Sequence, residues 1–244
     1  MENTKVFNFN GESSADHGVF ISGDSVYNAP ARGFEMVDIP GRNGQLAIDR
    51  GRFENIEVTY PAFIFADNQA DFAAKMRDLR AWLMSPIGYQ RLEDTYHPDE
   101  YRMAIYKSGL EADPTHYNGA GEFELTFDCK PQRFLTSGED EITVTSGDTL
   151  TNPSPFESLP LIEVTGTGTL TVGDVVITID GEASQVITLD SDMMEAYAEE
   201  GGAIVPKNDL ITINGNEFPK LDEETGITYT GLTSVKVTPR WWTI

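Results

Sequence analysis

The chain has 244 residues, of which 39% are hydrophobic and 23% charged, a composition typical of an ordered globular protein. Its 17 lysines and arginines are outnumbered by 40 aspartates and glutamates, so the formal net charge is -23. Because a field of this sign repels phosphate backbones and anionic lipid surfaces, the composition argues against nucleic acid and membrane as partners.

The length exceeds that of a usual single domain, so we expect two domains, each with its own core. Cys129 is the only cysteine, which excludes an intrachain disulfide and favours a buried structural thiol. The segment Met1–Gly11 lacks the apolar stretch of a signal peptide, and no later run approaches membrane-spanning length. We therefore expect synthesis in a cytoplasm.

Four segments of the first half alternate apolar with polar residues, as half-buried antiparallel strands do. Their apolar positions are Phe7 and Phe9; Ile56, Val58 and Tyr60; Tyr101, Met103 and Ile105; and Phe123, Leu125 and Phe127. We expect an antiparallel sheet in which these residues face the core.

One stretch of the first half, from Asn68 to Ser85, has helical periodicity instead. Asp67 or Asn68 can cap its start, and Pro86 and Gly88 end it. Charged residues separate apolar positions at the spacing of a helix, namely Phe72, Met76, Leu79 and Leu83. The pattern predicts an amphipathic helix that packs on the sheet of the same domain.

A change of composition after Asp128 predicts a domain boundary near Leu135. We therefore expect a first domain over residues 1–134 and a second over 135–244. The second contains many short segments typical of strands: 168–172, 175–179, 185–189, 210–213 and 234–238. Asp180-Gly181 and Asn214-Gly215 are typical of hairpin turns, and Ser191 to Glu200 is the only helical candidate. This pattern favours a β-sandwich or jelly roll.

The sequence contains no catalytic constellation that we can identify. His17, His97 and His116 are scattered singly, without the spacing of a metal site. Asp190-Ser-Asp192 resembles the start of a calcium loop but lacks the glycine and distal glutamate of an EF-hand, so calcium binding is left open. Gly166-Thr-Gly168 lacks the third glycine of a dinucleotide-binding loop. We expect no catalytic residue, no metal site and no cofactor.

A hairpin-like stretch runs from Pro40 to Ile56 and carries Arg42, Arg50 and Arg52 in an otherwise acidic protein. Guanidinium groups bind carboxylates in bidentate geometry, so these residues are candidates for clamping carboxylates on a neighbouring copy. A solvated hairpin with scattered charges is the alternative.

The chain closes on Trp241 and Trp242, which follow a segment with alternating Val235 and Val237. Continuing that alternation would carry Trp241 inward, so that the last strand seals the core. A platform on which a ligand stacks is the second interpretation of the tryptophan pair.

The order of these signals resembles the distal tail protein family of long-tailed phages, often called Dit, over nearly the whole chain. The segments that carry the resemblance are Pro40-Gly-Arg-Asn-Gly44 with Phe53-Glu-Asn-Ile56, the helix near 70–83, Phe127-Asp-Cys-Lys-Pro131, Thr151-Asn-Pro153, Pro160 to Gly166, Ile187 to Asp190 with Met194 to Tyr197, Phe218-Pro219 and Arg240-Trp-Trp242.

The resemblance implies a mainly β protein. Its first domain would combine a sheet, one helix and a projecting hairpin, and would close with other copies into a ring, usually of six. Its second domain would be a galectin-like β-sandwich. Such rings join the tail tube to the tail-tip hub protein and hold receptor-binding or fibre proteins, so the chain would lie at the tail tip of the virion.

Two other classes of function remain as alternatives. A carbohydrate-binding adhesion module would use Trp241 or Trp242 to stack on a sugar ring. A tail-tip hydrolase would need a paired acid site or a metal triad, and the sequence offers neither.

Overall fold

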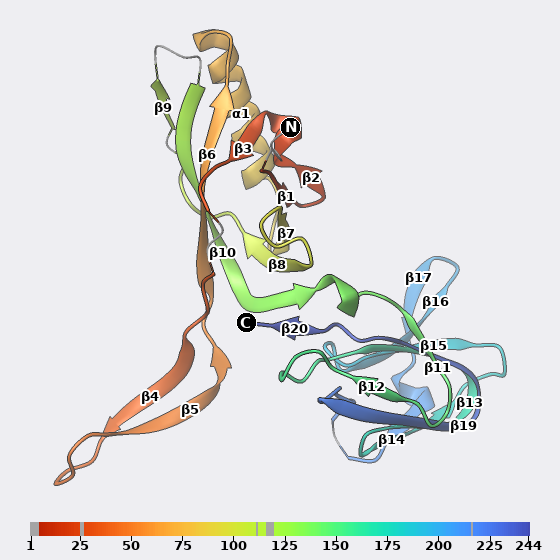
Figure 1. Cartoon of the computed structure of the whole chain (residues 1–244). Coiled ribbons are helices and arrows are strands. Elements are labelled where there is room, and N and C mark those ends of the chain that lie inside the picture. Colours follow the sequence, from red (N-terminus) through yellow and green to blue (C-terminus); the bar gives the residue numbers. More distant parts are fainter. Residues whose placement is uncertain (1–4, 25–26, 111, 116–119, 216) are drawn as a thin grey trace. The chain divides into compact units, whose positions relative to one another are not determined.

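The computed structural model describes residues 5–24, 27–110, 112–115, 120–215 and 217–244, without the side chains of 112–115 and 120. The chain forms two compact units (Figure 1). The first comprises residues 1–133 with Ile244, and the second comprises residues 134–243. The fold is mainly β, as the sequence predicts.

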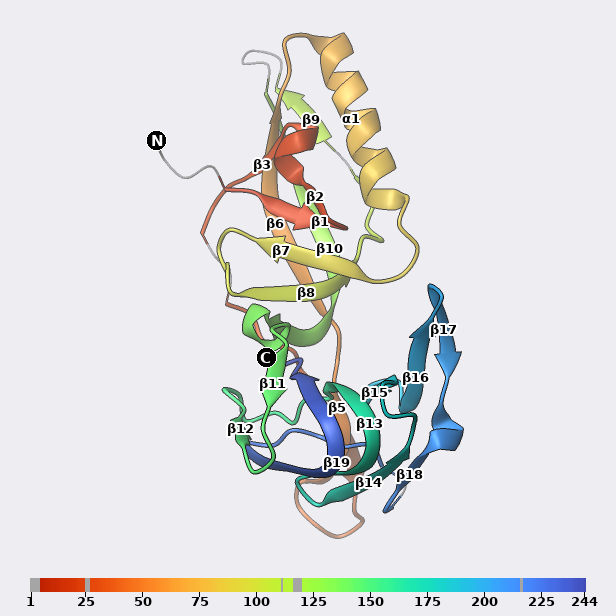
Figure 2. The same ribbon diagram turned by 90° about the vertical axis from the view of Figure 1, so that its right-hand side faces the viewer.

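The first unit is built on one antiparallel sheet whose strands follow the order β2-β1-β7-β8-β10-β6-β3, with β9 beside β10. The strands are β1 (Phe7–Phe9), β2 (Glu12–Ser13), β3 (Val19–Ile21), β6 (Ile56–Phe65), β7 (Gln90–Asp94), β8 (Glu100–Ile105), β9 (Ala112–Thr115) and β10 (Ala120–Leu135), and a 3-10 turn, η1 (Ser14–His17), joins β2 to β3. Figure 2 shows the helix α1 (Gln69–Met84) lying alongside this sheet.

The helix confirms the periodicity of the sequence. The Asn68 side chain accepts hydrogen bonds from the backbone N–H groups of Ala70 and Asp71, both at 3.0 Å, and so caps the first turn. The buried positions are Met76, Leu79, Trp82 and Leu83. Of these, Trp82 was not in the predicted stripe; its ring stacks on Phe7 at 5.6 Å and on His17 at 4.1 Å.

The predicted faces are correct for β6 and β10 and wrong for β8. Phe123, Leu125 and Phe127 are buried, as expected. On β8, however, the buried residues are Arg102 and Ala104, whereas Tyr101, Met103 and Ile105 are only partly covered. At this end of the sheet the Arg102 guanidinium is buried in a polar network that accepts a hydrogen bond from it. Arg102 therefore turns inward, and β8 presents to the core the face opposite to the one that hydrophobicity alone predicts.

A separate two-stranded sheet is formed by β4 (Arg32–Asp38) and β5 (Gln45–Phe53). The loop 39–44 joins its strands, so the predicted hairpin-like stretch contains β5 and most of this loop, whereas the partner strand β4 lies before it. Figure 1 shows it leaving the Ile56 end of β6 and projecting away from the sheet of the first unit.

The second unit is organised around two long paired strands, β13 (Leu161–Val172) and β19 (Glu224–Thr238). Along its other edge β13 pairs first with β15 (Val186–Asp190) and then with β14 (Val175–Asp180). The remaining elements are η2 (Thr136–Gly138), β11 (Ile142–Val144), β12 (Thr149–Thr151), β16 (Glu195–Glu200), β17 (Ala203–Pro206), η3 (Asn208–Leu210), β18 (Ile211–Ile213) and β20 (Trp242–Thr243). Apolar side chains of β11, β13, β14, β15, β16 and β19 enclose one core, which includes Trp241.

Two local predictions for this unit are wrong. The helical candidate at Ser191 to Glu200 is a turn followed by β16, because Ala196 and Ala198 alternate into the core and this packing outweighs their helix propensity. Asp180-Gly181 and Asn214-Gly215 do not join paired strands either: β15, which follows Asp180, pairs with β13, and β18, which precedes Asn214, pairs with β14.

Candidate assembly surface

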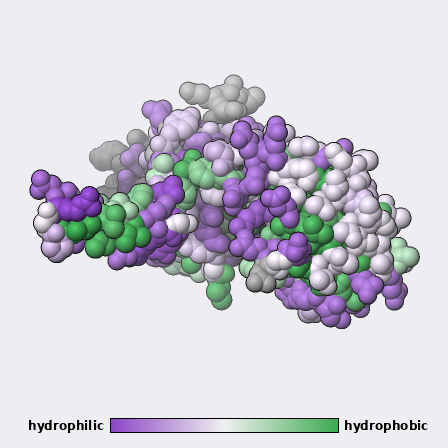
Figure 3. Space-filling view, turned by 90° about the horizontal axis from the view of Figure 1, so that it is seen from below, coloured by the Kyte–Doolittle hydropathy of each residue, from purple (hydrophilic) through white to green (hydrophobic). Residues whose placement is uncertain are grey.

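The β4–β5 hairpin exposes an unusual number of large apolar side chains. Phe34 is 50% exposed, Met36 53%, Leu46 49% and Ile48 45%. An isolated two-stranded hairpin is only marginally stable in water. Exposed apolar residues gathered in one place mark interaction surfaces. Figure 3 shows hydrophobic side chains gathered on the projecting hairpin, at the left of the view.

The strand register places these residues on both faces of the hairpin. Phe34 lies opposite Asp49 and Met36 lies opposite Ala47, so these four share one side, the Met36 face. Glu35 lies opposite Ile48 and Val37 lies opposite Leu46 on the other side, the Ile48 face. A hairpin with one apolar face could pack on its own domain, but two apolar faces need cover on both sides.

The three predicted interface arginines all lie on this hairpin but do not contact one another. Arg50 lies 3.6 Å from Glu35 and Arg52 lies 3.0 Å from Glu54, and all four side chains are about half exposed or more. Such exposed ion pairs contribute little free energy, so both guanidinium groups remain available to a partner. Arg42 lies in the loop, and its side chain has no hydrogen bond or ion pair to any described residue.

A fourth arginine, which the sequence analysis did not single out, links the two strands. The Arg32 guanidinium donates to the Asp49 carboxylate across the hairpin. This bond, together with the Gly51 N–H, holds the pKa of Asp49 below its ordinary value. Asp49 therefore stays charged at neutral pH, and the pair ties the base of β4 to β5.

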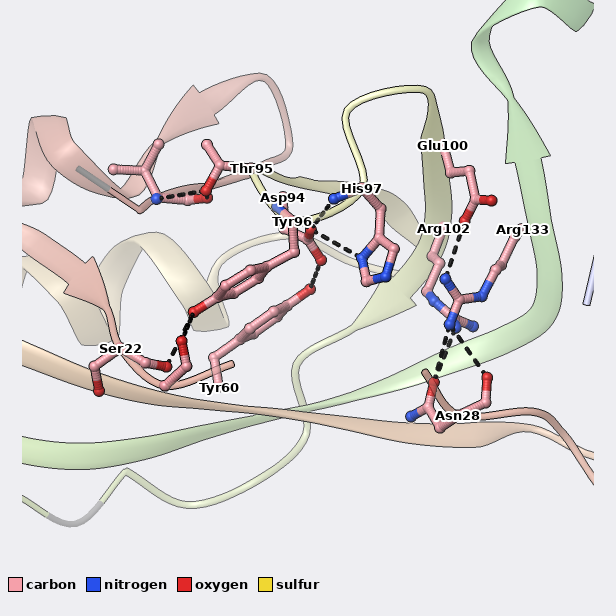
Figure 4. A network of polar contacts seen from close by, with 12 residues as sticks. Ser22, Asn28, Tyr60, Asp94, Thr95, Tyr96, His97, Glu100, Arg102 and Arg133 are labelled. Atoms are coloured by element: carbon pink, nitrogen blue, oxygen red, sulfur yellow. Dashed lines mark hydrogen bonds and ion pairs between the residues drawn. The ribbon is translucent and has the colours of Figure 1, made fainter. Parts of the chain in front are cut away.

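A polar network anchors the segment that leads into the hairpin (Figure 4). Asn28 Oδ1 accepts from Arg102 at 3.1 Å and from Arg133 at 3.3 Å, and the Asn28 carbonyl accepts from Arg133 at 3.2 Å. Arg133 also forms an ion pair with Glu100 at 3.0 Å. Both guanidinium groups are buried. We call these four residues, Asn28, Glu100, Arg102 and Arg133, the base network.

The same segment is held at a second point by Tyr96, which donates to the Ser22 carbonyl at 3.0 Å. Nearby, Tyr60 donates to Asp94 at 2.7 Å. Burial, and then the charge and hydrogen bond of Asp94, raise the pKa of Tyr60 well above its ordinary value. The tyrosine is therefore a fixed hydrogen-bond donor.

A small cavity of about 30 Å³ lies between these two groups of residues. It has room for about one or two water molecules. Arg102 Nη1 and His97 Nε2, which belong to residues lining it, are buried without a hydrogen-bond partner among the described residues. Burial, followed by the nearby charge of Arg133, lowers the pKa of Arg102. The arrangement positions the root of the hairpin.

The two terminal tryptophans have different surroundings. Trp241 is 5% exposed and belongs to the core of the second unit, and its carbonyl accepts from Leu135 N–H at 2.9 Å. Trp242 is half-buried, stacks on Phe156 at 4.7 Å and donates its indole N–H to the Glu157 carbonyl at 2.9 Å. Each ring thus has a packing partner within the second unit.

The other residues considered as candidates for metal binding or catalysis are Asp190, Cys129 and the histidines, and Asp190 and Cys129 each have a role in packing or ion pairing. Asp190 forms a bidentate ion pair with Arg240, at 2.8 and 3.1 Å, and accepts from the N–H groups of Asp192 and Met193. Cys129 is fully buried, and burial raises the pKa of its thiol to about 12.

His17 and His97 lie apart from each other, and His116 lies outside the described residues. Among the residues that are described, no group of three His, Cys, Asp or Glu side chains could hold a metal ion. No described helix is long and apolar enough to cross a membrane.

Residues 14–129 match the family model of the phage tail protein RIFT-related domain. The matched residues lie within the first unit and cover β3 to β9, the helix α1 and most of β10, whereas β1 and β2 precede them.

Solved structures extend the likeness to both units. The chain is similar to SPP1 Dit, described as a paradigm of the hub adsorption apparatus in phages that infect Gram-positive bacteria: the TM-score is 0.76 at 13% identity, over 96% of this chain and 98% of that one. It is also similar to a chain of the phage P2 baseplate in its activated conformation with Ca, with a TM-score of 0.58 at 10% identity over 96% of each chain. No curated protein matches the sequence.

At these identities the structural likeness shows the fold, which is shared over nearly the entire length. The family match in the first unit and the fold shared with SPP1 Dit agree with the resemblance carried by the sequence segments named above.

Proposed function

We propose that the chain is a structural protein of a phage tail tip. Six copies would form a ring through their first units, join the tail tube protein to the tail-tip hub protein, and hold receptor-binding or fibre proteins. The protein would be synthesised in the host cytoplasm and reside in the virion. The observation that carries the proposal is a hairpin with two exposed apolar faces, on a unit with a phage tail domain.

The hydrophobic effect favours covering this hairpin by another chain. Fully burying a large aliphatic or aromatic side chain stabilises by about 1.5–3 kcal/mol, and four such side chains of the hairpin are about half exposed. When the hairpin of one copy contacts a different surface of the next copy, the contact is head to tail, and contacts of this kind form a ring when the rotation between copies closes.

Charge decides where the contact can form. Each copy carries a formal net charge of -23, so two copies repel one another at long range. A stable contact therefore needs local opposite charge, and Arg42, Arg50 and Arg52 supply it on the hairpin.

The test is the oligomeric state of a hairpin variant, measured by light scattering after gel filtration and by electron microscopy. Arg42→Glu, Arg50→Glu and Arg52→Glu combined should leave a folded monomer. The matched control, Lys130→Glu, Lys220→Glu and Lys236→Glu, changes the net charge equally. It should still form rings.

Two results would contradict the proposal. Rings in the arginine variant would show that the hairpin charges do not hold the assembly. The ring itself would be ruled out if the parent protein stayed monomeric at all accessible concentrations and bound no tail-tube or hub partner.

Carbohydrate binding is less well supported than assembly. A sugar platform needs an exposed aromatic face, whereas Trp241 is buried and one face of Trp242 is occupied by Phe156. The sandwich fold of the second unit is compatible with sugar binding but does not by itself indicate it. An enzymatic role has no supporting constellation among the described residues.

A further inference from the structure

We propose that the outer face of β3, β6 and β10 is the surface that receives the hairpin of a neighbouring copy. This inference rests on the proposed ring and adds to it the docking surface. The outer face is the side of these strands that points away from the core of the first unit.

Three phenylalanines lie together on this outer face. Phe20 on β3 lies opposite Phe63 on β6, with ring centroids 5.8 Å apart, and Phe63 contacts Phe65 at 5.3 Å. Phe65 is 56% exposed, whereas its neighbour Ile64 is fully buried on the opposite side of the strand. We call Phe20, Phe63 and Phe65 the aromatic patch.

Cross-strand packing accounts for only part of this patch. A pair such as Phe20 and Phe63 stabilises a sheet by side-chain contact even on a solvated face. An antiparallel sheet with one face in water normally carries polar residues there, however, and an aromatic ring as exposed as Phe65 is left uncovered by the pair.

Two glutamates border the aromatic patch. Glu122 lies opposite Phe63, and Glu124 lies opposite Pro61. Both side chains are exposed, and neither has a hydrogen bond or ion pair to a described residue. They are two residues apart on one strand, which separates them by about 7 Å. The outer face thus offers aromatic surface with unpaired negative charge beside it.

The Ile48 face of the hairpin has the complementary composition. Val37, Leu46 and Ile48 provide apolar surface. Arg50 and Arg52, separated by one glycine, lie next to it on β5, and Glu35 on the same face pairs with Arg50 at 3.6 Å. Docking this face on the patch would bury apolar residues on both sides. It would also place two arginines near Glu122 and Glu124.

The hairpin of the same chain is not suited to occupy the patch. It leaves the Ile56 end of β6, while the patch lies toward the Phe65 end, more than about 20 Å along the strand. Figure 1 shows the hairpin pointing away from that end. The occupant is therefore a second copy. Because the hairpin and the patch are different surfaces, the contact is head to tail, as a ring requires.

A charge exchange tests the pairing. Glu122→Arg with Glu124→Arg should weaken association about tenfold or more, and so should Arg50→Glu with Arg52→Glu. All four substitutions in one chain restore opposite charges at every contact and should bring association back to within about threefold of the parent. Asp174→Arg with Glu182→Arg, two exposed positions of the second unit, is the charge-matched control for the patch variant and should associate like the parent.

An apolar substitution tests the patch without changing charge. Phe65→Ser should weaken association, whereas Ile87→Ser, at an apolar residue that is 96% exposed elsewhere on the first unit, should not. Association constants come from sedimentation velocity across a concentration series, and circular dichroism verifies that each variant is folded.

The outcomes separate this inference from the ring itself. If the parent forms rings and the hairpin variant does not, but both patch variants assemble normally, the hairpin docks elsewhere and the inference is wrong while the proposed function stands. The inference would also be wrong if the variant with all four substitutions associated no better than either double variant. A parent that never assembles removes the proposed function first.

Discussion

Truncation of Trp241 to alanine should strongly destabilise the second unit. The ring is 5% exposed and lies in the core with residues of β13, β14, β15 and β19. A buried tryptophan removes roughly 150–250 Å² from water, which at about 25 cal/mol per Å² corresponds to about 4–6 kcal/mol. Measured Trp→Ala substitutions in cores cost about 3–5 kcal/mol, so we expect a loss in that range.

Trp242→Ala is the neighbouring comparison. This ring is half-buried, and its truncation removes one stack on Phe156 and one hydrogen bond to the Glu157 carbonyl. The stack is worth about 0.5–1.5 kcal/mol and the hydrogen bond about 1 kcal/mol. We expect the cost to be at most about half that of Trp241→Ala.

Calorimetry of the full chain measures both effects. A loss of 3 kcal/mol or more should lower the midpoint of the second unit by about 10 °C or more. If both variants melt like the parent, the packing account of the terminal strand fails. If binding to a host-cell polysaccharide is lost at the same time, a sugar platform should replace it.

Three further predictions concern the second unit and the buried thiol. A fragment of residues 134–244 should unfold cooperatively by itself; a non-cooperative melt would contradict independent folding. Although burial alone raises the pKa of Asp190, hydrogen bonds from Arg240 and the backbone hold it below its ordinary value. The resulting stabilisation is complete above about pH 4 and is lost as pH falls through the pKa of Asp190 in the folded chain. Asp190→Asn should therefore lower the free energy of unfolding by about 1.5–3 kcal/mol at pH 6, and by less at acidic pH. At pH 8 a thiol reagent should modify Cys129 far more slowly in the folded than in the unfolded chain, because the raised pKa lowers the thiolate fraction roughly a thousandfold; equal rates would refute the burial.

Sequence periodicity predicted the elements whose two faces differ most in polarity. In β10, Phe123, Leu125 and Phe127 alternate with polar residues and are buried. In α1, a good N-cap and an apolar stripe indicate the same helix that the structure contains. In such segments local pattern and tertiary packing favour the same arrangement, so one sequence suffices to predict them.

The failures occur where packing decides against the local pattern. On β8, Tyr101 is covered from outside by the Arg91 guanidinium, 3.7 Å from the ring centroid, while Arg102 turns inward to Asn28. At Ala196 and Ala198, small residues fit against the core of a sheet although alanine prefers helix. Asn28 lies 74 residues from Arg102 in the sequence, so no local signal could have indicated this contact.

The exposed hairpin was visible as a hairpin but not as an apolar surface. Leu46, Ala47 and Ile48 are consecutive apolar residues, and such a run is usually a strand buried on both faces. The signal was therefore present, but it predicts burial without saying against what. Only the register, which separates the Met36 face from the Ile48 face, shows that the cover has to come from two sides.

The base network at the root of the hairpin suits a hairpin that is covered by another chain. Burying Arg102 and Arg133 costs desolvation free energy that an apolar contact would not. Hydrogen bonds are directional, however, whereas apolar contacts allow sliding, and together the two guanidinium groups bond Asn28 through both its side chain and its carbonyl. In the proposed ring, the hairpin of each copy would meet a neighbour at a fixed angle, and a root whose direction is fixed in this way would favour that contact.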